Sequence, residues 1–262
     1  MDYYPRGWTS VGDGRPSDER PGEWAQQLPP WQGQRDWCPS RGSAAGLFVE
    51  EVYSRAAANR TAECGRVERV GAEGDGGKWI CVDDQLLPPE DCVVYSLGSR
   101  LDFSFESDLV ARFGCEVHTF DCTVGTPPPA AVPRGVAFHP WCVGGKDAVQ
   151  AISSDLGHEG ESRQYFTLAT ILGKLGHEGI ALLKMDIERH ELAVVAALTG
   201  EAAPAQIAFE THLHNAYGMW GRPVTEGEWD ALWGKLHALG YGVFANEPNP
   251  RCLCCCEFSL RR

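Results

Sequence analysis

Short apolar runs alternate with amphipathic segments from residue 92 almost to the last residue of the chain. The apolar runs, each suited to a strand, cover residues 92–98, 115–121, 135–143, 179–186 and 206–212. The segments with helical spacing of apolar residues cover 105–114, 168–175, 191–198 and 226–239. Two further strands, 240–248 and 255–262, follow with no helix between them. This order predicts a doubly wound α/β fold: a mostly parallel sheet covered by helices, with an antiparallel C-terminal hairpin at one edge.

Helix boundaries carry their own signals. Thr167 is placed to cap the helix that begins at 168, and Gly176 to end it. Thr225 and Glu228 have the spacing of a capping box, in which each side chain bonds the other residue's backbone amide. These signals predict where two of the helices start.

The chain divides into two regions by composition. Residues 1–42 contain six prolines and six glycines, with no hydrophobic periodicity. Such a segment buries too little apolar surface to offset the entropy of ordering, so we predict a disordered extension at 1–42. The folded domain is expected at 43–262, with its first helix at 43–59.

Charge and hydropathy restrict the partners and the location. The formal net charge is −13, which argues against broad binding to nucleic-acid phosphates. The sequence contains no stretch of about 18 uncharged apolar residues, so no membrane span is predicted. The first residues, MDYYPRGWTSVGDGR, have no apolar core of a signal peptide, so the sequence predicts a cytoplasmic location. The oligomeric state stays open.

The cysteine count is high. Of eleven cysteines, six are scattered beside strand-like runs, where we expect small buried apolar side chains. They are Cys64, Cys81, Cys92, Cys115, Cys122 and Cys142. The run CLCCCE at 252–257 is denser, and a soft metal ion or a disulfide is a candidate there.

Charged residues crowd the end of the strand at 179–186. Lys184, Asp186 and Glu188 alternate and so share one face. In a doubly wound sheet, ligands bind outside the carboxyl ends of the strands. These charges therefore lie at the predicted active edge, where they pair with one another or meet a ligand.

Other strand ends fall at the same edge. Gly98 lets the backbone approach a ligand closely, and Asp121 stands where doubly wound proteins place an acid for ribose hydroxyls. Lys78, in the glycine-rich GDGGKWIC, could offer a cation to a carboxylate. Glu210, His212 and His214 share one face of the strand at 206–212 and its continuation.

Several of these motifs together resemble the FkbM-type branch of S-adenosylmethionine-dependent methyltransferases, especially its methyltransferase-like eukaryotic relatives. The resemblance extends over about 60–262 and rests on RVGAEGDGGKWIC, DCVVYSLGS with SFE, FGCEVHTFD, LLKMDIERHE, IAFETH, LGYGVFANEPN and CCEFSL. It implies a Rossmann-like seven-stranded fold, and methyl transfer from S-adenosylmethionine to a hydroxyl of a sugar or another small metabolite. The partner would be a small-molecule or glycan acceptor.

The resemblance also implies roles for individual residues. Gly98, Ser99 and Glu106 would face the methionine end of the cofactor, and Asp121 the ribose. Asp186 would lie close to the sulfonium and the acceptor. An alcohol acceptor benefits from a general base, for which Asp186, His190 and His212 are the candidates.

One departure bears on the local geometry. The family has glycine after the glutamate of its D-x-E-G-x-E motif, whereas this chain has Arg189. If the turn needs a positive φ, arginine strains it.

Two other functions compete with methyl transfer. A metal-dependent hydrolase could use Asp186, Glu210, His212 and His214, and a non-catalytic binding protein could keep the fold without turnover.

Overall fold

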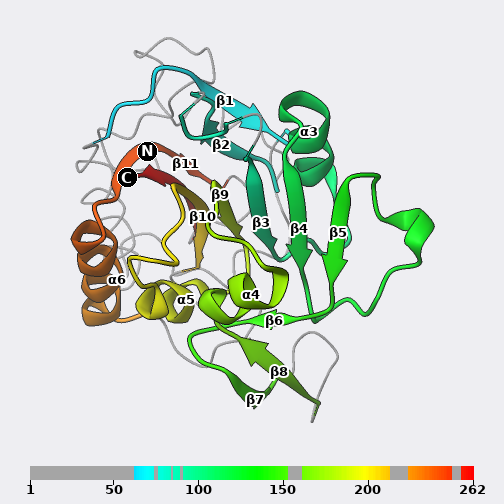
Figure 1. Cartoon of the computed structure of the whole chain (residues 1–262). Coiled ribbons are helices and arrows are strands. Elements are labelled where there is room, and N and C mark those ends of the chain that lie inside the picture. Colours follow the sequence, from blue (N-terminus) through cyan, green and yellow to red (C-terminus); the bar gives the residue numbers. More distant parts are fainter. Residues whose placement is uncertain are drawn as a thin grey trace, which may run out of the picture.

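The computed structural model describes residues 62–73, 76–83, 85–88, 91–152, 161–212, 224–249 and 255–262 (Figure 1). The extension expected at 1–42, the helix expected at 43–59 and His214 lie outside these residues. So do Cys252 and Cys254 of the cysteine-rich run.

A seven-stranded sheet forms the centre of the molecule, with the strand order β11-β12-β10-β9-β3-β4-β5. Its strands are β3 (Val93–Leu97), β4 (Glu116–Phe120), β5 (Val136–His139), β9 (Leu182–Met185), β10 (Gln206–His212), β11 (Gly242–Pro248) and β12 (Cys255–Arg261). From β10 to β5 all neighbours are parallel, whereas β12 runs antiparallel to both β10 and β11. The predicted α/β fold with a large, mostly parallel sheet is confirmed. The closing strands do pair antiparallel, but β12 lies between β10 and β11.

Helices cover both faces of this sheet (Figure 1). Helix α3 (Ser104–Phe113) packs its Phe105 and Leu109 on one face, against Val94 and Val117. Helices α4 (Leu168–Leu175), α5 (Glu191–Ala197) and α6 (Glu226–Ala238) cover the other face in a larger apolar core. Because side chains alternate along each strand, the two cores receive alternate residues of the same strands.

The helix starts agree with the sequence signals. The Thr167 hydroxyl accepts a hydrogen bond from the Thr170 amide, and Gly176 ends α4 with a left-handed φ of 75°. At α6 the Thr225 and Glu228 side chains form the reciprocal capping box. Both caps satisfy amides that the first helical turn leaves without partners.

Two small sheets were not predicted. Strands β1 (Val67–Val70) and β2 (Lys78–Cys81) form an antiparallel hairpin, and β6 (Cys142–Val143), β7 (Ala148–Ala151) and β8 (Ser162–Phe166) form a three-stranded sheet. Most of these strands have only two to four residues, so they carry little periodic signal. Segment 78–81, predicted to belong to a loop, is a buried strand.

The hairpin is fastened to the main sheet by side chains. The Gln206 side chain accepts a hydrogen bond from the Cys81 amide at 3.0 Å and donates to the Cys81 carbonyl at 2.9 Å. The Ser259 hydroxyl donates to the Trp79 carbonyl at 2.5 Å. These bonds hold β2 beside β10 and β12, which places Lys78 at the carboxyl end of the parallel strands.

Four of the six scattered cysteines are buried as expected (Cys81, Cys92, Cys115 and Cys142), but all six are paired. They form three disulfides, Cys64–Cys81, Cys92–Cys115 and Cys122–Cys142. Cys255 is also disulfide-bonded, whereas Cys256 is a buried free thiol. Each of the three disulfides joins segments 17 to 23 residues apart, so each closes a loop of the unfolded chain.

We expect these disulfides to contribute measurably to stability. Closing loops of this length stabilises a protein by about 3 kcal/mol in the chain-entropy account. The double variant Cys92→Ala/Cys115→Ala should therefore lose about 2–4 kcal/mol of unfolding free energy in urea. Mass spectrometry of non-reduced peptides should show the three linkages, and alkylation of Cys92 and Cys115 without prior reduction would contradict them.

Candidate active site

The turns after β3 and β9 touch at the carboxyl edge of the sheet. Gly98 follows β3 with a φ of 78°, and a Cβ atom there would overlap the carbonyl oxygen of Asp186. The Asp186 amide donates to the Leu97 carbonyl at 3.0 Å. Glycine is thus required at 98 both for its backbone conformation and for this close approach.

Asp121 holds the turn that follows Gly98. Its Oδ2 atom accepts hydrogen bonds from the Ser99 amide at 3.1 Å and the Arg100 amide at 2.9 Å. Its Oδ1 atom accepts from the Thr123 amide at 3.0 Å and the Thr123 hydroxyl at 2.7 Å. The structure therefore brings Gly98, Ser99 and Asp121 together, and the Asp121 carboxylate fixes the path of the turn.

A buried lysine sits among carboxylates beside Asp186. Lys78 Nζ lies 2.6 Å from Glu257 Oε1 and 3.2 Å from Asp186 Oδ2, and the Lys78 side chain is 1% exposed. Burial alone would lower the pKa of Lys78, but the negative charges of Glu257 and Asp186 raise it above its usual value. The lysine is therefore charged at neutral pH.

The same network holds Asp186 ionised. Burial would raise the pKa of Asp186, but the charges of Lys78, Lys184 and His212 outweigh this effect and hold that pKa well below its usual range. Lys184, also buried, donates to the Gly98 carbonyl. Asp186 is thus a fixed anion at the centre of the carboxyl edge.

His212 lies within reach of four carboxylates. Its Nε2 atom is 3.4 Å from Glu188 Oε2, 3.5 Å from Glu210 Oε2 and 4.0 Å from Asp186 Oδ1. Its Nδ1 atom is 3.7 Å from Glu191 Oε1. Burial would lower the pKa of His212, but these negative charges raise it well above its usual value. His212 is therefore an imidazolium cation at neutral pH.

Two further glutamates complete the cluster: Glu191, noted from the sequence as part of the charged strand end but given no role, and Glu257, which was not singled out. Burial raises the pKa of Glu191 to about 7, and its Oε1 accepts from the Ile187 amide at 2.7 Å. Glu257 is the carboxylate nearest to Lys78, and the lysine's positive charge opposes the effect of burial on the Glu257 pKa. Glu257 pairs directly with Glu210 in the β12–β10 register, so the strand pattern of CCEFSL could have revealed it.

Glu106 and His190 are the remaining predicted site residues, and the charge of Lys184 acts on Glu106 as it does on Asp186. Glu106 Oε1 accepts from the Ser96 hydroxyl at 2.5 Å, while its buried Oε2 has no hydrogen-bond partner among the described residues. Burial raises the pKa of Glu106 and lowers that of His190. The His190 ring packs on Tyr165, with 5.5 Å between ring centroids. Among the described residues, neither a hydrogen bond nor an ion pair joins His190 to Asp186.

The turn after β9 is left-handed at two consecutive positions. Glu188 has a φ of 53° and Arg189 a φ of 79°. The turn therefore needs the positive φ that a glycine at 189 would adopt without strain. Arg189 accepts that conformation at an energetic cost.

Three of the four residues that the hydrolase hypothesis named as metal ligands lie close together in the structure. The ligand atoms of Asp186, Glu188 and His212 lie within 4.8 Å of one another, and Glu210 contacts His212. The fourth residue of that hypothesis, His214, lies outside the described residues.

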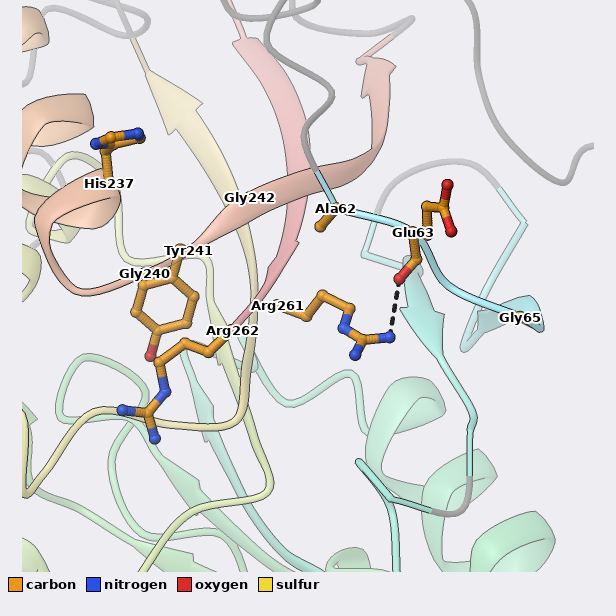
Figure 2. A pocket seen from close by; sticks show the side chains of 9 residues that line it. All are labelled: Ala62, Glu63, Gly65, His237, Gly240, Tyr241, Gly242, Arg261 and Arg262. Carbon is orange, nitrogen blue, oxygen red and sulfur yellow. Dashed lines mark hydrogen bonds between the residues drawn. The ribbon is translucent and has the colours of Figure 1, made fainter.

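A separate pocket opens at the opposite end of the sheet (Figure 2). It has a volume of about 700 Å³ and lies around the first residue of β11, Gly242, and the last of β12, Arg261. The Arg261 guanidinium donates to the Glu63 carbonyl across it at 2.8 Å. These residues mark the amino end of the parallel strands, so the pocket is remote from Asp186.

Comparison with known proteins identifies the family of the chain. Residues 49–261 match a family described as a methyltransferase domain. The chain belongs to this family. In the part of this family member that the structure describes, no helix is long and apolar enough to cross a membrane.

Curated relatives carry a related name. A rat protein called "Probable methyltransferase-like protein 24" is 29% identical over 216 residues, and its human counterpart 28% over 214. Each alignment covers 77% of this chain and 55% of the relative, so the chain spans about half the length of these proteins. A solved structure described as a mutant of MtNAS aligns with 68% of this chain and 57% of its own at 9% identity. Its TM-score of 0.31 is too low to support an argument.

The strain at position 189 can be measured by comparing two variants. Arg189→Gly and Arg189→Ala both remove the arginine side chain, but only glycine also removes the Cβ. We expect Arg189→Gly to be more stable than Arg189→Ala by about 1–2 kcal/mol in urea unfolding. At the exposed α6 position Asp230 the order should reverse, with glycine about 1 kcal/mol less stable than alanine. If the stability difference between the glycine and the alanine variant had the same sign at both positions, the result would contradict a strained turn.

Glu191 should make stability depend on pH. Its folded pKa of about 7 exceeds the unfolded value of about 4.3, so between these pH values only the folded protein keeps the proton. The contribution of Glu191 to the unfolding free energy is then greatest below about pH 4.3 and is lost as the pH rises to about 7. Glu191→Gln keeps the acceptor for the Ile187 amide but does not titrate. The unfolding free energy of wild type relative to this variant should fall over that window, and a pH-independent difference would refute the assignment.

Proposed function

We propose that the chain is an S-adenosylmethionine-dependent methyltransferase of the FkbM type that methylates a hydroxyl of a sugar or another small metabolite. The observation that carries the proposal is the contact between the Gly98 turn and Asp186, which places a fixed anion beside a glycine turn at the carboxyl edge. Ligands of doubly wound folds bind at this edge. The membership of a methyltransferase domain family supports the reaction class.

The described residues fit such a cofactor. Glu106 Oε2 is a buried acceptor without a partner among them, suited to the ammonium group of the methionine end. Gly98 and Ser99 bring the backbone close to the same edge. Asp121 is proposed to bind the ribose, whose hydroxyl would take the place of the Thr123 hydroxyl on Oδ1. Lys78 would act through Asp186, which it holds in position.

When bound, S-adenosylmethionine supplies an activated methyl group, so the protein mainly has to orient the acceptor and exclude water. Asp186 is proposed to accept the hydrogen bond of the acceptor hydroxyl, which points an oxygen lone pair toward the cofactor. His212, charged at neutral pH, would hold Asp186 rather than act as the base. As the methyl group bonds to the acceptor oxygen, the hydroxyl proton would pass through Asp186 to Glu188, which shares the His212 Nε2 contact and whose pKa burial raises.

The location is proposed to be an oxidising compartment rather than the cytoplasm that the sequence predicted. Three disulfides in one domain are typical of proteins that fold where thiols are oxidised. Hydroxyl groups of glycans and small metabolites are accessible in such compartments, so the proposed acceptor class is compatible with this location.

The substitution Asp186→Asn tests the proposal. Asparagine keeps the shape, and Lys78 keeps its bond to Glu257, so the fold should survive. Cofactor affinity should stay within a few-fold, while methyl transfer to a panel of sugars and small alcohols should fall by about 10²–10⁴. In the wild type, S-adenosylhomocysteine at a hundred times its dissociation constant should raise the melting temperature by roughly 5–10 °C.

Matched measurements separate the alternatives. Asp230→Asn removes an exposed carboxylate from α6 and should leave affinity and turnover unchanged. Absence of a melting shift with folded wild type would remove the cofactor assignment, and binding without any turnover would favour a non-catalytic binding protein. Inactivation of wild-type hydrolysis by a chelator would favour the metal-dependent hydrolase.

A further inference from the structure

A second cluster of ionisable side chains lies where β4, β5 and the turn after α4 meet. Glu116 and His118 are two residues apart on β4 and therefore share one face of the sheet. His139 is the last residue of β5, and His177 follows Gly176 at the end of α4. Tyr95 of β3 contacts His177. The proposed methyl transfer uses none of these residues.

Three of these side chains point one atom each toward a common point. Glu116 Oε1 lies 2.9 Å from His118 Nε2 and 3.4 Å from His177 Nε2, and all three atoms lie within 4.8 Å of one another. A tetrahedral Zn²⁺ ion has nitrogen and oxygen ligands at about 2.0–2.2 Å, which places neighbouring ligand atoms about 3.3 Å apart. The two separations from Glu116 are close to this value, and the two histidine nitrogens are at most 4.8 Å apart.

We propose that Glu116, His118 and His177 bind a divalent transition metal ion, with Zn²⁺ as the ion that suits these ligands. Two imidazoles and one carboxylate are ligands that zinc accepts, whereas Mg²⁺ and Ca²⁺ require oxygen ligands. The Glu116 side chain is 61% exposed, so the ion can enter from solvent and keep a coordination position for water.

The surroundings of the two histidines favour metal binding through Nε2. His118 Nδ1 lies 2.9 Å from His139 Nε2, and His177 Nδ1 lies 2.7 Å from the Tyr95 hydroxyl. A histidine that ligates through Nε2 carries its proton on Nδ1 and donates it to such an outer partner, which fixes the ring orientation. Both rings therefore have the second contact that zinc-binding histidines use.

Other groups with ligand-like spacing are weaker candidates for a separate site. In one, the sulfurs of Cys64 and Cys81 are joined in a disulfide and are not available as thiolates. In others, Asp186, Glu210 or His212 belongs to the candidate active site. The cluster around His118 differs because none of its residues belongs to that site, and its Glu116, at the amino end of β4, is exposed to solvent. A bound ion would link β4 to the turn that precedes β9, and so would brace this side of the sheet.

Zinc titration of the full chain tests the proposal. Protein freed of metal by a chelator, with its disulfides intact, should bind one Zn²⁺ at this site, measured by calorimetry. At a hundred times the dissociation constant, zinc should raise the melting temperature by roughly 5–10 °C. Cobalt(II) bound in its place should give the visible absorption of a four-coordinate ion with nitrogen and oxygen ligands and no sulfur charge-transfer band.

Substitutions of the proposed ligands test where the ion binds. Glu116→Gln, at an exposed position where folding is not at risk, and His118→Ala should each weaken zinc affinity by roughly 100-fold or more, with loss of one zinc equivalent at a fixed concentration. His139→Ala removes only an outer partner and should weaken affinity by about 10-fold. His237→Ala, an exposed histidine on α6, is the matched control and should bind as wild type.

The outcomes are distinct from those of the methyltransferase tests, because zinc affinity is measured without cofactor or acceptor. Absence of zinc binding to folded wild type would overturn the proposal. Equal affinity and stoichiometry in wild type, Glu116→Gln and His118→Ala would also overturn it, because the ion would then lie elsewhere.

Discussion

The buried ammonium group of Lys78 constrains much of the structure around it. An unpaired charge at this depth would cost several kcal/mol, so strand β2 can occupy its place only where carboxylates meet the lysine. Glu257 of β12 and Asp186 after β9 provide them, at 2.6 and 3.2 Å. The interaction joins a hairpin from early in the chain to two strands of the main sheet. It also fixes the charge and position of Asp186, on which the proposed methyl transfer depends.

The central sheet could be predicted because its strands are buried on both faces and its helices have strong end signals. Apolar runs such as 92–98 and caps such as Thr167 are local features that a sequence displays directly. The hairpin β1–β2 and the sheet of β6, β7 and β8 lack such signals, since their strands are short. The disulfide pairs were not predictable either, because the partner of Cys92 is set by the register of β3 beside β4 rather than by spacing.

The candidate site was predictable where it depends on strand ends. Gly98, Asp121, Asp186 and His212 gather because the parallel strands end at one edge. Lys78 and Glu257 are separated by 179 residues, and no local pattern shows that they meet. His190 is a different case. It directly follows the charged turn in sequence, but the start of α5 directs its ring toward Tyr165. Arg189 was correctly identified as a position where a positive φ would cause strain.

The position of β12 between β10 and β11 has a consequence for how the chain acquires its structure during synthesis. The other six strands of this sheet, as described, precede β12 in the chain and so leave the ribosome earlier, yet β10 and β11 are not neighbours in the sheet order without it. Until residues 255–261 emerge, β10 exposes an unpaired edge, and Lys78 lacks its nearest counter-ion. Nascent chains in that state present the unpaired backbone groups that chaperones cover and that promote aggregation. The sheet therefore cannot be completed before residues 255–261 are available, which makes folding of this domain sensitive to loss of β12.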